Sequence, residues 1–395
     1  MKSQAVSIVV MGAAVLAVLV LPVAVSGANL LPNGDFEADP DGTMRTGQDY
    51  VDTTTFTQWR AFAVGGAGST FRVTSAAASS GSKGMEMAYD TAGADSALDK
   101  DAAAFRVPIA GNRVYQLKVD ARDGGPYGGT PSFVVGFQMF NSGGYAGGRS
   151  YSFDPSSTFE TIGQTVTASA TIQALSVRFD MGGSTAGRSV QLDNARVYDV
   201  THSNRVVNGG FENSASRALN WRFFAAGGAT GSVSISSDAY EGAHAALLSR
   251  TNTTGDTGLD LWGGPGSPSV AVLGGQESIQ VSFAAKKVSG DSNTRLGLQV
   301  ATFDANGTFL GDAFGTRYNV GSGGYTVFST GPLALASNVA YVSMGWRVVS
   351  DTGGPAIGSY LLDGAVIVPE PATLILLAGG LFVMGRIGRR HRRVG

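Results

Sequence analysis

The stretch Asn33-Gly34-Asp35-Phe36-Glu37 returns 175 residues later as Asn208-Gly209-Gly210-Phe211-Glu212, and this repetition decides how the chain is organised. A second stretch recurs behind it: residues 59–67 read WRAFAVGGA and residues 221–229 read WRFFAAGGA. The second pair is offset by 162 residues, so the copies differ by insertions of loop length. We therefore expect two tandem copies of one domain.

Further matches extend the repeat to the end of each copy. They are Gly81 with Gly242, Leu98-Asp99 with Leu259-Asp260, and Leu192-Asp193 with Leu362-Asp363. We place the first copy at residues 29–200, a linker at 201–204 and the second copy at 205–368. The extra length of the first copy falls between Ala38 and Phe56, where we expect a longer loop.

The composition and the hydrophobic pattern of both copies favour short strands. Charged residues make up only 15% of the chain and there are 57 glycines, which suits strands joined by many turns. Apolar and polar residues alternate over several segments, namely 115–121, 132–140 and 175–181 in the first copy and 279–284, 296–303 and 341–346 in the second. The pattern predicts an all-β fold of two tandem jelly-roll β-sandwiches.

The N-terminus has the features of a secretory signal peptide over residues 1–28. Lys2 supplies the basic start, residues 6–25 are apolar, and small residues follow up to Ala28. Ser26 and Ala28 would occupy the −3 and −1 positions, so the mature chain would start at Asn29. The alternative is a signal helix that is retained as a membrane anchor.

The C-terminus, residues 369–395, has three features in a fixed order. Pro369-Glu370-Pro371 is followed by an uncharged stretch, 372–385, and then by five arginines between 386 and 393. The uncharged stretch predicts a short transmembrane helix, which flanking arginines can extend by snorkelling. The arginines should stay on the cytoplasmic side, so the two domains would face outward.

This ending resembles the PEP-CTERM sorting signal of bacteria with an outer membrane. The resemblance implies recognition by an exosortase near Pro369, Glu370 and Pro371, after export by the secretion machinery. It also implies an inner-membrane intermediate, and then a place at the cell surface or in an extracellular matrix rich in polysaccharide. A plain anchoring helix is the alternative.

The order of the repeated motifs resembles carbohydrate-binding modules with a galactose-binding-like jelly roll. Those modules open with Asn-Gly-x-Phe-Glu, continue with a Trp and a glycine turn, and close on a strand that bears Asp. The resemblance implies structural calcium at Glu37 with Asp193, and at Glu212 with Asp363. Carboxylates together with turn carbonyls are the oxygen ligands that Ca²⁺ prefers. The alternative is that these acids cap turns or lie free on the surface.

The aromatic residues divide into core and ligand candidates. Trp59 and Trp221 recur at matching positions, which predicts core packing. Trp262 stands in a glycine-rich stretch of the second copy alone, and Tyr127 and Tyr145 stand among glycines in the first. Flat exposed rings in loops can stack on sugars, so these three are the candidate ligand-binding residues.

Several classes of function find no support in the sequence. There is no cysteine, three histidines offer no Ser-His-Asp arrangement, and no glycine-rich phosphate loop opens a helix. Without the terminal segments, 22 Lys and Arg stand against 29 Asp and Glu, which argues against nucleic acid as a partner.

We therefore expect an exported surface or matrix protein, not an enzyme, that binds or organises extracellular polysaccharide. The alternatives are a structural or adhesive matrix protein without sugar binding and a polysaccharide-degrading enzyme with two carboxylates in a cleft.

Overall fold

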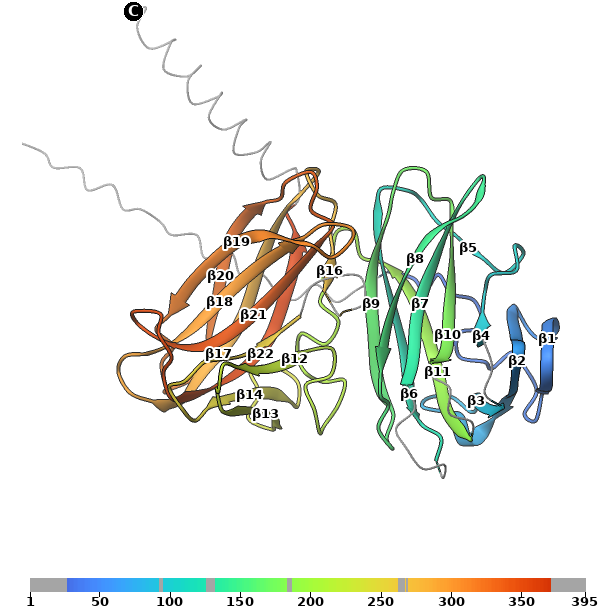
Figure 1. The fold of residues 1–395 in the computed structure, drawn as a ribbon, viewed down its shortest axis with the longest axis horizontal. Helices are drawn as coiled ribbons and strands as arrows, with labels where there is room; N and C mark the ends of the chain where they lie inside the picture. The colour runs from blue at the N-terminus through green and yellow to red at the C-terminus, as the bar shows by residue number, and fades with distance from the viewer. Residues whose placement is uncertain are drawn as a thin grey trace, which may run out of the picture.

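The computed structural model describes residues 27–91, 95–125, 132–182, 187–261, 267 and 269–370. Within these ranges the chain forms strands β1 to β22, one 3-10 turn, η1 (Ser75–Ala77), and no α-helix, which confirms the all-β prediction (Figure 1). None of the described helical turns is long and apolar enough to cross a membrane. Residues 1–26 of the expected signal and the hydrophobic segment 372–385 lie outside the described part of the chain.

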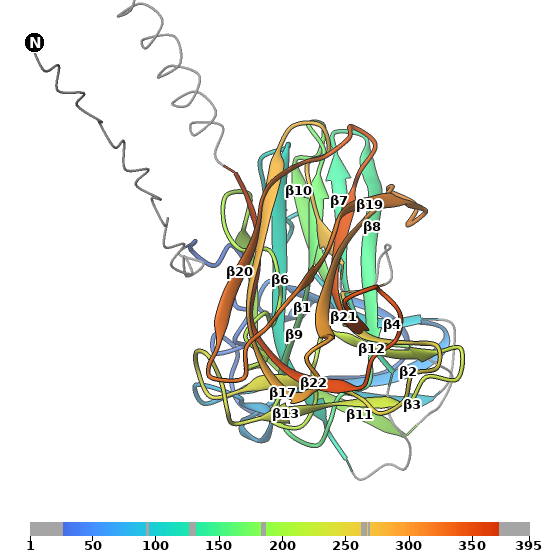
Figure 2. The same ribbon diagram turned by 90° about the vertical axis from the view of Figure 1, so that its left-hand side faces the viewer.

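The second copy is a jelly-roll sandwich of two antiparallel sheets. One sheet has the order β12 (Arg222–Ala226), β15 (Asp256–Asp260), β21 (Tyr341–Ser350), β18 (Thr294–Phe303) and β19 (Phe309–Tyr318), with β16 (Val270–Ala271) beside β21. The other has the order β13 (Gly231–Ser236), β14 (Ala245–Arg250), β22 (Gly358–Pro369), β17 (Ser278–Gly290) and β20 (Thr326–Ala334). Figure 2 shows the two layers, with β13, β17 and β20 on one side and β12, β19 and β21 on the other.

The first copy has the same plan, but its two layers are joined into one continuous sheet. The order is β8 (Gly144–Phe153), β7 (Ser132–Asn141), β10 (Ala174–Gly182), β4 (Asp95–Asp99), β2 (Trp59–Thr74), β3 (Gly84–Thr91), β11 (Arg188–Asp199), β6 (Arg113–Asp123) and β9 (Glu160–Ala168). Two further strands lie off this path, β1 (Met44–Phe56) beside β2 and β5 (Val107–Pro108) beside β10. The joint is β2, which pairs with β4 through its first half and with β3 through its second.

The insertion in the first copy is a strand, so the expectation of a longer loop there is wrong. Residues 44–56 form β1, which pairs with both halves of β2. Three consecutive threonines, 53–55, favour an extended backbone, and the open edge of β2 supplies the hydrogen-bonding partner. In the second copy nothing covers that edge among the described residues, and the chain breaks at Gly227-Gly228 into β12 and β13.

Each sandwich has its own aromatic core, as the repeat predicts. Trp59 is completely buried and stacks on Phe36 with ring centroids 5.3 Å apart. Trp221 is 8% exposed and stacks on Trp346 at 4.7 Å, with Phe211 on its other side. The placement of Trp59 and Trp221 in the core is therefore confirmed. Burial of such large rings contributes several kcal/mol to each sandwich, roughly 2–3 per ring from area alone.

The repeated Asn-Gly of each opening motif has a steric reason. A Cβ on Gly34 would lie 2.0 Å from the carbonyl oxygen of Ala195, and a Cβ on Gly209 would lie 1.9 Å from that of Ala365. In both copies the alanine N–H donates to the glycine carbonyl over 2.8 Å. Only glycine permits this close approach, so the first motif of each copy is docked on its last strand.

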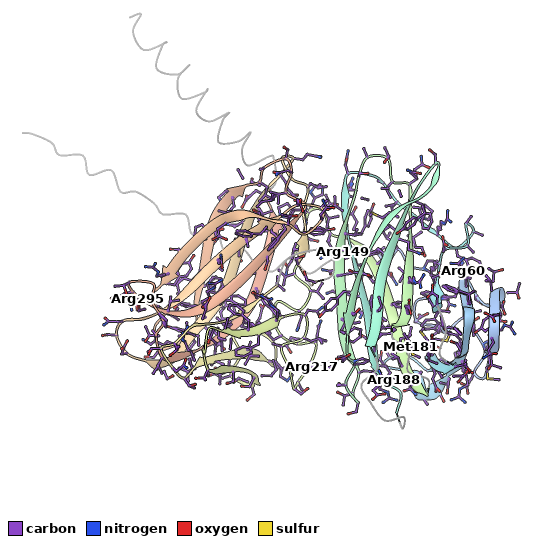
Figure 3. The ribbon with its side chains drawn as sticks, viewed as in Figure 1. Arg60, Arg149, Met181, Arg188, Arg217 and Arg295 are labelled. Atoms are coloured by element: carbon purple, nitrogen blue, oxygen red, sulfur yellow. The ribbon has the colours of Figure 1, made fainter. Side chains whose placement is uncertain are left out.

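The two sandwiches meet through a buried interface beside the edge strand β9 (Figure 3). Arg149 is 3% exposed, and its guanidinium donates to the carbonyl oxygens of Ser267 and Ser269 of the second copy, both over 2.8 Å. Arg205 follows the predicted linker and is fully buried in an ion pair with Glu277. The linker is thus part of a packed junction and does not hang free between the copies.

Candidate functional site

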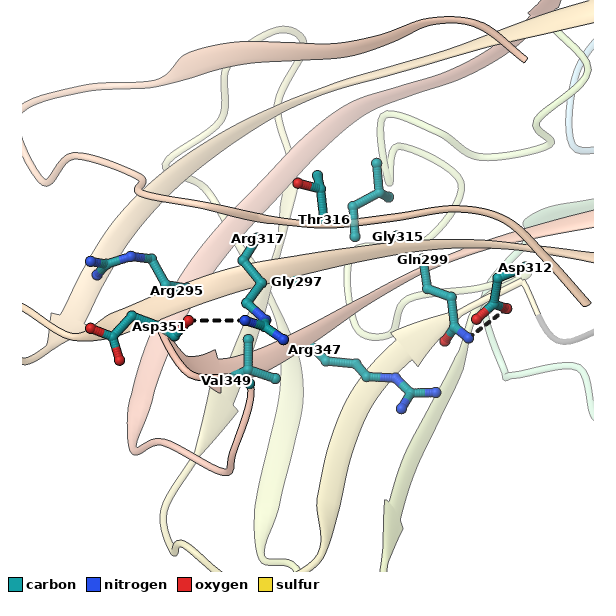
Figure 4. Close-up of a pocket in the computed structure, with 12 residues that line it drawn as sticks. Arg295, Gly297, Gln299, Asp312, Gly315, Thr316, Arg317, Arg347, Val349 and Asp351 are labelled. Atoms are coloured by element: carbon teal, nitrogen blue, oxygen red, sulfur yellow. Dashed lines mark hydrogen bonds between the residues drawn. The ribbon is translucent and has the colours of Figure 1, made fainter. Parts of the chain in front are cut away.

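A groove crosses the outer face of the sheet that contains β21, β18 and β19 (Figure 4). Its larger part has a volume of about 740 Å³ and is lined by these strands and by the loop that follows β21. A smaller hollow of about 240 Å³ continues it toward β12 and shares the lining residues Gln299 and Arg347. The two together run across all five long strands of the sheet.

Strand register places charged, small and aromatic residues in one row across this face. Arg347 on β21 pairs with Gly297 on β18, which pairs in turn with Arg317 on β19. In the other direction Arg347 pairs with Gly258 on β15, which pairs with Phe224 on β12. Partners in adjacent antiparallel strands point to the same face, so these five residues form one transverse row.

Glycines make the floor of the groove open. A Cβ on Gly315 would meet nothing within 4 Å, and a Cβ on Gly297 would only touch the Val349 side chain at 3.4 Å. At Gly345 a Cβ would lie 2.8 Å from the Cβ of Asp260, so this position admits no side chain without a shift. The hollow therefore follows from missing side chains at strand positions where most sheets carry one.

Three arginines border the groove, and each is held in place. The Arg347 guanidinium forms an ion pair with Asp256 over 2.6 Å. Arg317 donates to the carbonyl oxygen of Asp351 over 2.9 Å, and its guanidinium fits against the bare backbone of Gly353, where a Cβ would lie 2.3 Å from Nη2. Arg295 donates to the carbonyl oxygen of Ser292 over 2.6 Å. Fixed guanidinium groups lose little freedom when they bind a ligand.

Aromatic and amide groups complete the lining. Phe224 lies in the smaller hollow, 5.5 Å from the guanidinium carbons of both Arg222 and Arg347. Phe309 stands at the rim and is 54% exposed. The amide of Gln299 donates to Asp312 over 2.7 Å within the groove. The site thus offers apolar rings in the smaller hollow and planar hydrogen-bond donors in the larger part.

The repeated Trp-Arg and Leu-Asp motifs form an ion pair beside this face in both copies. Arg60 pairs with Asp99 over 2.6 Å in the first copy, and Arg222 pairs with Asp260 over 2.8 Å in the second. Burial raises the pKa of Asp99, although the hydrogen bonds from Arg60 oppose that rise. The motifs therefore recur because they tie β2 to β4 and β12 to β15.

The four acids expected at calcium sites each accept backbone hydrogen bonds from the turn led by Gly81 or Gly242. Glu37 accepts from the N–H groups of Ser82 and Lys83, and Asp193 accepts from those of Ser79 and Ser80. In the second copy, Glu212 and Asp363 accept in the same way, from the N–H groups of Ala243 and His244 and from those of Tyr240 and Glu241. Each acid pair thus clamps the turn to the first motif and the last strand.

The contacts around Gly210 bear on whether these acids could also hold a cation. A Cβ at Gly210 would lie 3.7 Å from Oδ1 of Asp363 and 3.7 Å from Cγ of Glu212, so both acids face this small cradle. Burial raises the pKa of Asp363 to about 6, against the hydrogen bonds from Glu241 and its neighbours. The described residues contain no cluster of three acidic, His or Cys side chains. The two acids fit calcium only with backbone oxygens as further ligands, and the calcium site stays a prediction.

The sequence candidates for ligand binding lie elsewhere. Tyr145 is 65% exposed at the start of β8 in the first copy, with its ring edge-on to Phe140 at 6.0 Å. Trp262 and Tyr127 lie outside the described residues. Of the groove residues, Arg317 and Arg347 belong to no repeated motif, and Phe224 lies in the repeated Trp-Arg motif but is not among the predicted ligand-binding residues. The sequence feature that could have revealed the groove is the alternation in β18, β19 and β21, where glycines and arginines occupy positions that face outward.

The predicted processing residues lie at the two ends of the described chain. Ala28 is exposed, and the chain docks directly after it, since Asn29 accepts the N–H of Val197 over 2.9 Å. At the other end Pro369 is buried and pairs with Ile279, and the N–H of Glu370 donates to Ser278 over 2.8 Å. Pro371 lies outside the described residues. Both processing sites stay predictions.

The C-terminal segment has a counterpart among known protein families. Residues 368–393 match the PEP-CTERM protein-sorting motif. The match confirms the resemblance drawn from Pro369-Glu370-Pro371, the uncharged stretch and the arginines. A PEP-CTERM motif implies export, processing by an exosortase and a surface or extracellular destination. No curated protein matches the chain in sequence.

Solved structures similar to the body of this chain include carbohydrate-binding modules. The tandem CBM22-1–CBM22-2 domain of Paenibacillus barcinonensis Xyn10C is 16% identical, covers 89% of this chain and 100% of its own, and has a TM-score of 0.31. The CBM22-1 xylan-binding domain of the same protein is 21% identical over 41% of this chain and 91% of its own, with a TM-score of 0.30.

A third similar structure is an enzyme domain. The enzymatically active domain of bacteriophage CBA120 tailspike protein 4 is 15% identical, covers 42% of this chain and has a TM-score of 0.34. This chain spans only 21% of that domain's length. The assignment of the fold rests on strand order and not on these similarities.

Proposed function

We propose that this PEP-CTERM protein is displayed outside the cytoplasm, through an inner-membrane intermediate, and binds extracellular polysaccharide without cleaving it. The observation that carries the proposal is the open groove on the second copy. Its glycine floor, fixed arginines and rim phenylalanines form one continuous lining across five strands. Strands lie about 4.8 Å apart, so the groove is roughly 20 Å long, enough for several sugar units of an extended chain.

The chemistry of the lining suits a sugar chain. Hydroxyl groups need donors and acceptors at fixed positions, which Arg317, Gln299 and Asp312 supply. Apolar faces of sugar rings need flat contact surfaces, which Phe224 and Phe309 supply in the smaller hollow. The groove is open along the sheet surface, so a polymer can enter from the side without threading through a tunnel.

The acids in and beside the groove support binding in preference to catalysis. Glycoside hydrolysis needs one free carboxylate and one carboxylic acid facing each other across the bond. Here Asp256 pairs with Arg347, Asp260 pairs with Arg222, and Asp312 accepts from Gln299. Each of these three carboxylates is therefore already engaged by a side chain of the protein.

Affinity electrophoresis of the full chain against a panel of polysaccharides, including the exopolysaccharide of its own host, tests this proposal. We expect retardation by at least one polysaccharide and no release of reducing ends. Gly297→Val places in the groove the residue that the first copy carries at the matching position, Val134, and should weaken binding about tenfold. Val134→Gly is the matched control and should leave binding unchanged.

The outcomes separate the three roles. A chain that retards on no polysaccharide has the structural or adhesive role, and the proposal fails. Release of reducing ends would identify a polysaccharide-degrading enzyme. Equal binding by the wild type and by Gly297→Val would show that the binding site lies outside the groove.

A further inference from the structure

We infer that the groove selects an acidic polysaccharide, one whose sugar units carry carboxylates, over a neutral one. This inference rests on the proposed function and names its substrate class. Three arginines, Arg295, Arg317 and Arg347, border the larger part of the groove. Without the terminal segments the chain has 29 acidic and 22 basic residues, so these three arginines form a positively charged cluster on a negatively charged protein.

Two of these arginines have no carboxylate of the protein as a partner. Within the described residues, Arg317 and Arg295 donate only to backbone carbonyl oxygens, and neither forms an ion pair with an Asp or Glu carboxylate. Each keeps guanidinium N–H groups for a ligand. The preferred partner of a planar guanidinium is a carboxylate that it can bind with two parallel hydrogen bonds.

The acids of the groove do not cancel this preference. Asp312 accepts the amide of Gln299, and Asp351 presents its carbonyl oxygen to Arg317 (Figure 4). Asp256 pairs with Arg347, whose side chain stays 41% exposed. Of the three, only Arg347 is paired with a carboxylate of the described residues, which orients its guanidinium, whereas Arg317 and Arg295 are oriented by backbone carbonyl oxygens.

The spacing of the arginines fits a repeating acidic chain. Arg347 and Arg317 stand in one row with only the Gly297 strand between them. Their backbones are therefore about 10 Å apart, which matches the length of a disaccharide unit in an extended polysaccharide. A chain laid across the strands would present a carboxylate on every second sugar to successive arginines.

Neutral sugars are usually bound by stacking on aromatic side chains, and no described aromatic residue lines the larger part of the groove. Among the described residues, Trp346 lines the smaller hollow but is fully buried and has no face for stacking. Phe224 on β12 and Phe309 on β19 line the smaller hollow, and neither ring lines the larger part that Arg295 and Arg317 border. The larger part of the groove therefore recognises its ligand through guanidinium donors.

Polygalacturonate and its methyl-esterified form are the probes that test this inference, because they share one backbone and differ in the charge of the carboxyl group. Titration calorimetry on the full chain should show the acid form binding at least about tenfold more tightly in low salt, with the difference shrinking as salt rises. Arg317→Gln should lower affinity for the acid form about tenfold. Arg72→Gln, at an exposed pair with Glu86 in the first copy, is the control and should change nothing.

Three results overturn the inference. Equal binding of both forms, or binding of a neutral polysaccharide alone, would refute acid selection and leave the proposed function standing. Equal loss in Arg317→Gln and Arg72→Gln would show a general charge effect in place of a site. Failure to bind any polysaccharide in the panel would instead refute the proposed function.

Discussion

The outer faces of the two sandwiches carry the same ion pair but use it differently. In the first copy Arg60 pairs with both Asp99 and Asp101, and Arg178 pairs with Asp95 and Asp180. These pairs cover the sheet with side chains. In the second copy the residue that matches Arg178 is Gly345, and the face is open.

Asp256, the acid beside the groove, pairs with an arginine at a different position from the one that its counterpart Asp95 uses. Asp95 and Asp256 occupy matching positions, because each pairs with the last residue of its partner strand segment, Val64 or Ala226. Asp95 binds Arg178, whereas Asp256 binds Arg347, which stands two residues further along the matching strand. The arginine thus stands two residues apart in the two copies, on a face that is covered in the first copy and forms a groove in the second.

The largest effect on stability is expected in the first copy, where the ion pair between Arg60 and Asp99 is more buried than its counterpart in the second copy. The Asp99 side chain is fully buried, so Asp99→Ala should lower the free energy of unfolding by about 3 kcal/mol, because a guanidinium loses its buried partner. Asp260→Ala should cost about 1 kcal/mol, since Arg222 is 40% exposed and water replaces the carboxylate. Urea denaturation of both variants measures the difference. Equal losses would mean that the two faces are equally buried.

A second, smaller difference should appear as a dependence on pH. Arg178→Gln leaves Asp95 and Asp180 facing each other, and burial already raises the pKa of Asp180. A carboxyl whose pKa is higher in the folded state adds stability at low pH and loses it as pH rises through that pKa. The variant should therefore be about 2 kcal/mol less stable than wild type at pH 7, and this deficit should shrink toward pH 4.

Arg347→Gln is the matched variant for that measurement. It leaves only Asp256, which is 35% exposed, so its deficit should stay below about 1 kcal/mol and should hardly change with pH. Thermal melts of both variants from pH 4 to 7 provide the comparison. A pH-independent deficit in Arg178→Gln would show that the two acids of the first copy are not close enough to couple.

The sequence predicted the shared framework well because the framework is what the copies have in common. The Asn-Gly approach, the buried tryptophans and the closing aspartates all recur as residues. The larger part of the groove could not be found in this way, because its glycine and arginine positions differ between the copies. Gly345 in place of Arg178 and Gly297 in place of Val134 are informative only once strand register shows that they share one face.

The extra strand of the first copy, β1, could not be predicted from the repeat either. Residues 44–56 have no counterpart in the second copy, so nothing in the comparison indicated their structure. Their conformation depends on an edge of β2 that exists only after the sandwich has formed. Tyr145 and the terminal segments outside the described residues keep their sequence-based assignments as predictions.

The smallest expected effect concerns the turn clamps, where the copies differ by one acid. The first copy has Asp35 at the position of Gly210, which adds a negative charge beside Glu37, although the described residues hold no group of three acids that could bind a metal. If the predicted calcium binds, about 1 mM Ca²⁺ should raise the melting temperature by a few degrees relative to EDTA, as ligands of the folded state do. Asp193→Asn should remove most of this rise and Asp363→Asn the smaller remainder. Equal melting curves in calcium and EDTA would leave the four acids as hydrogen-bonded clamps alone, a role that the backbone contacts of Glu37 and Glu212 already account for.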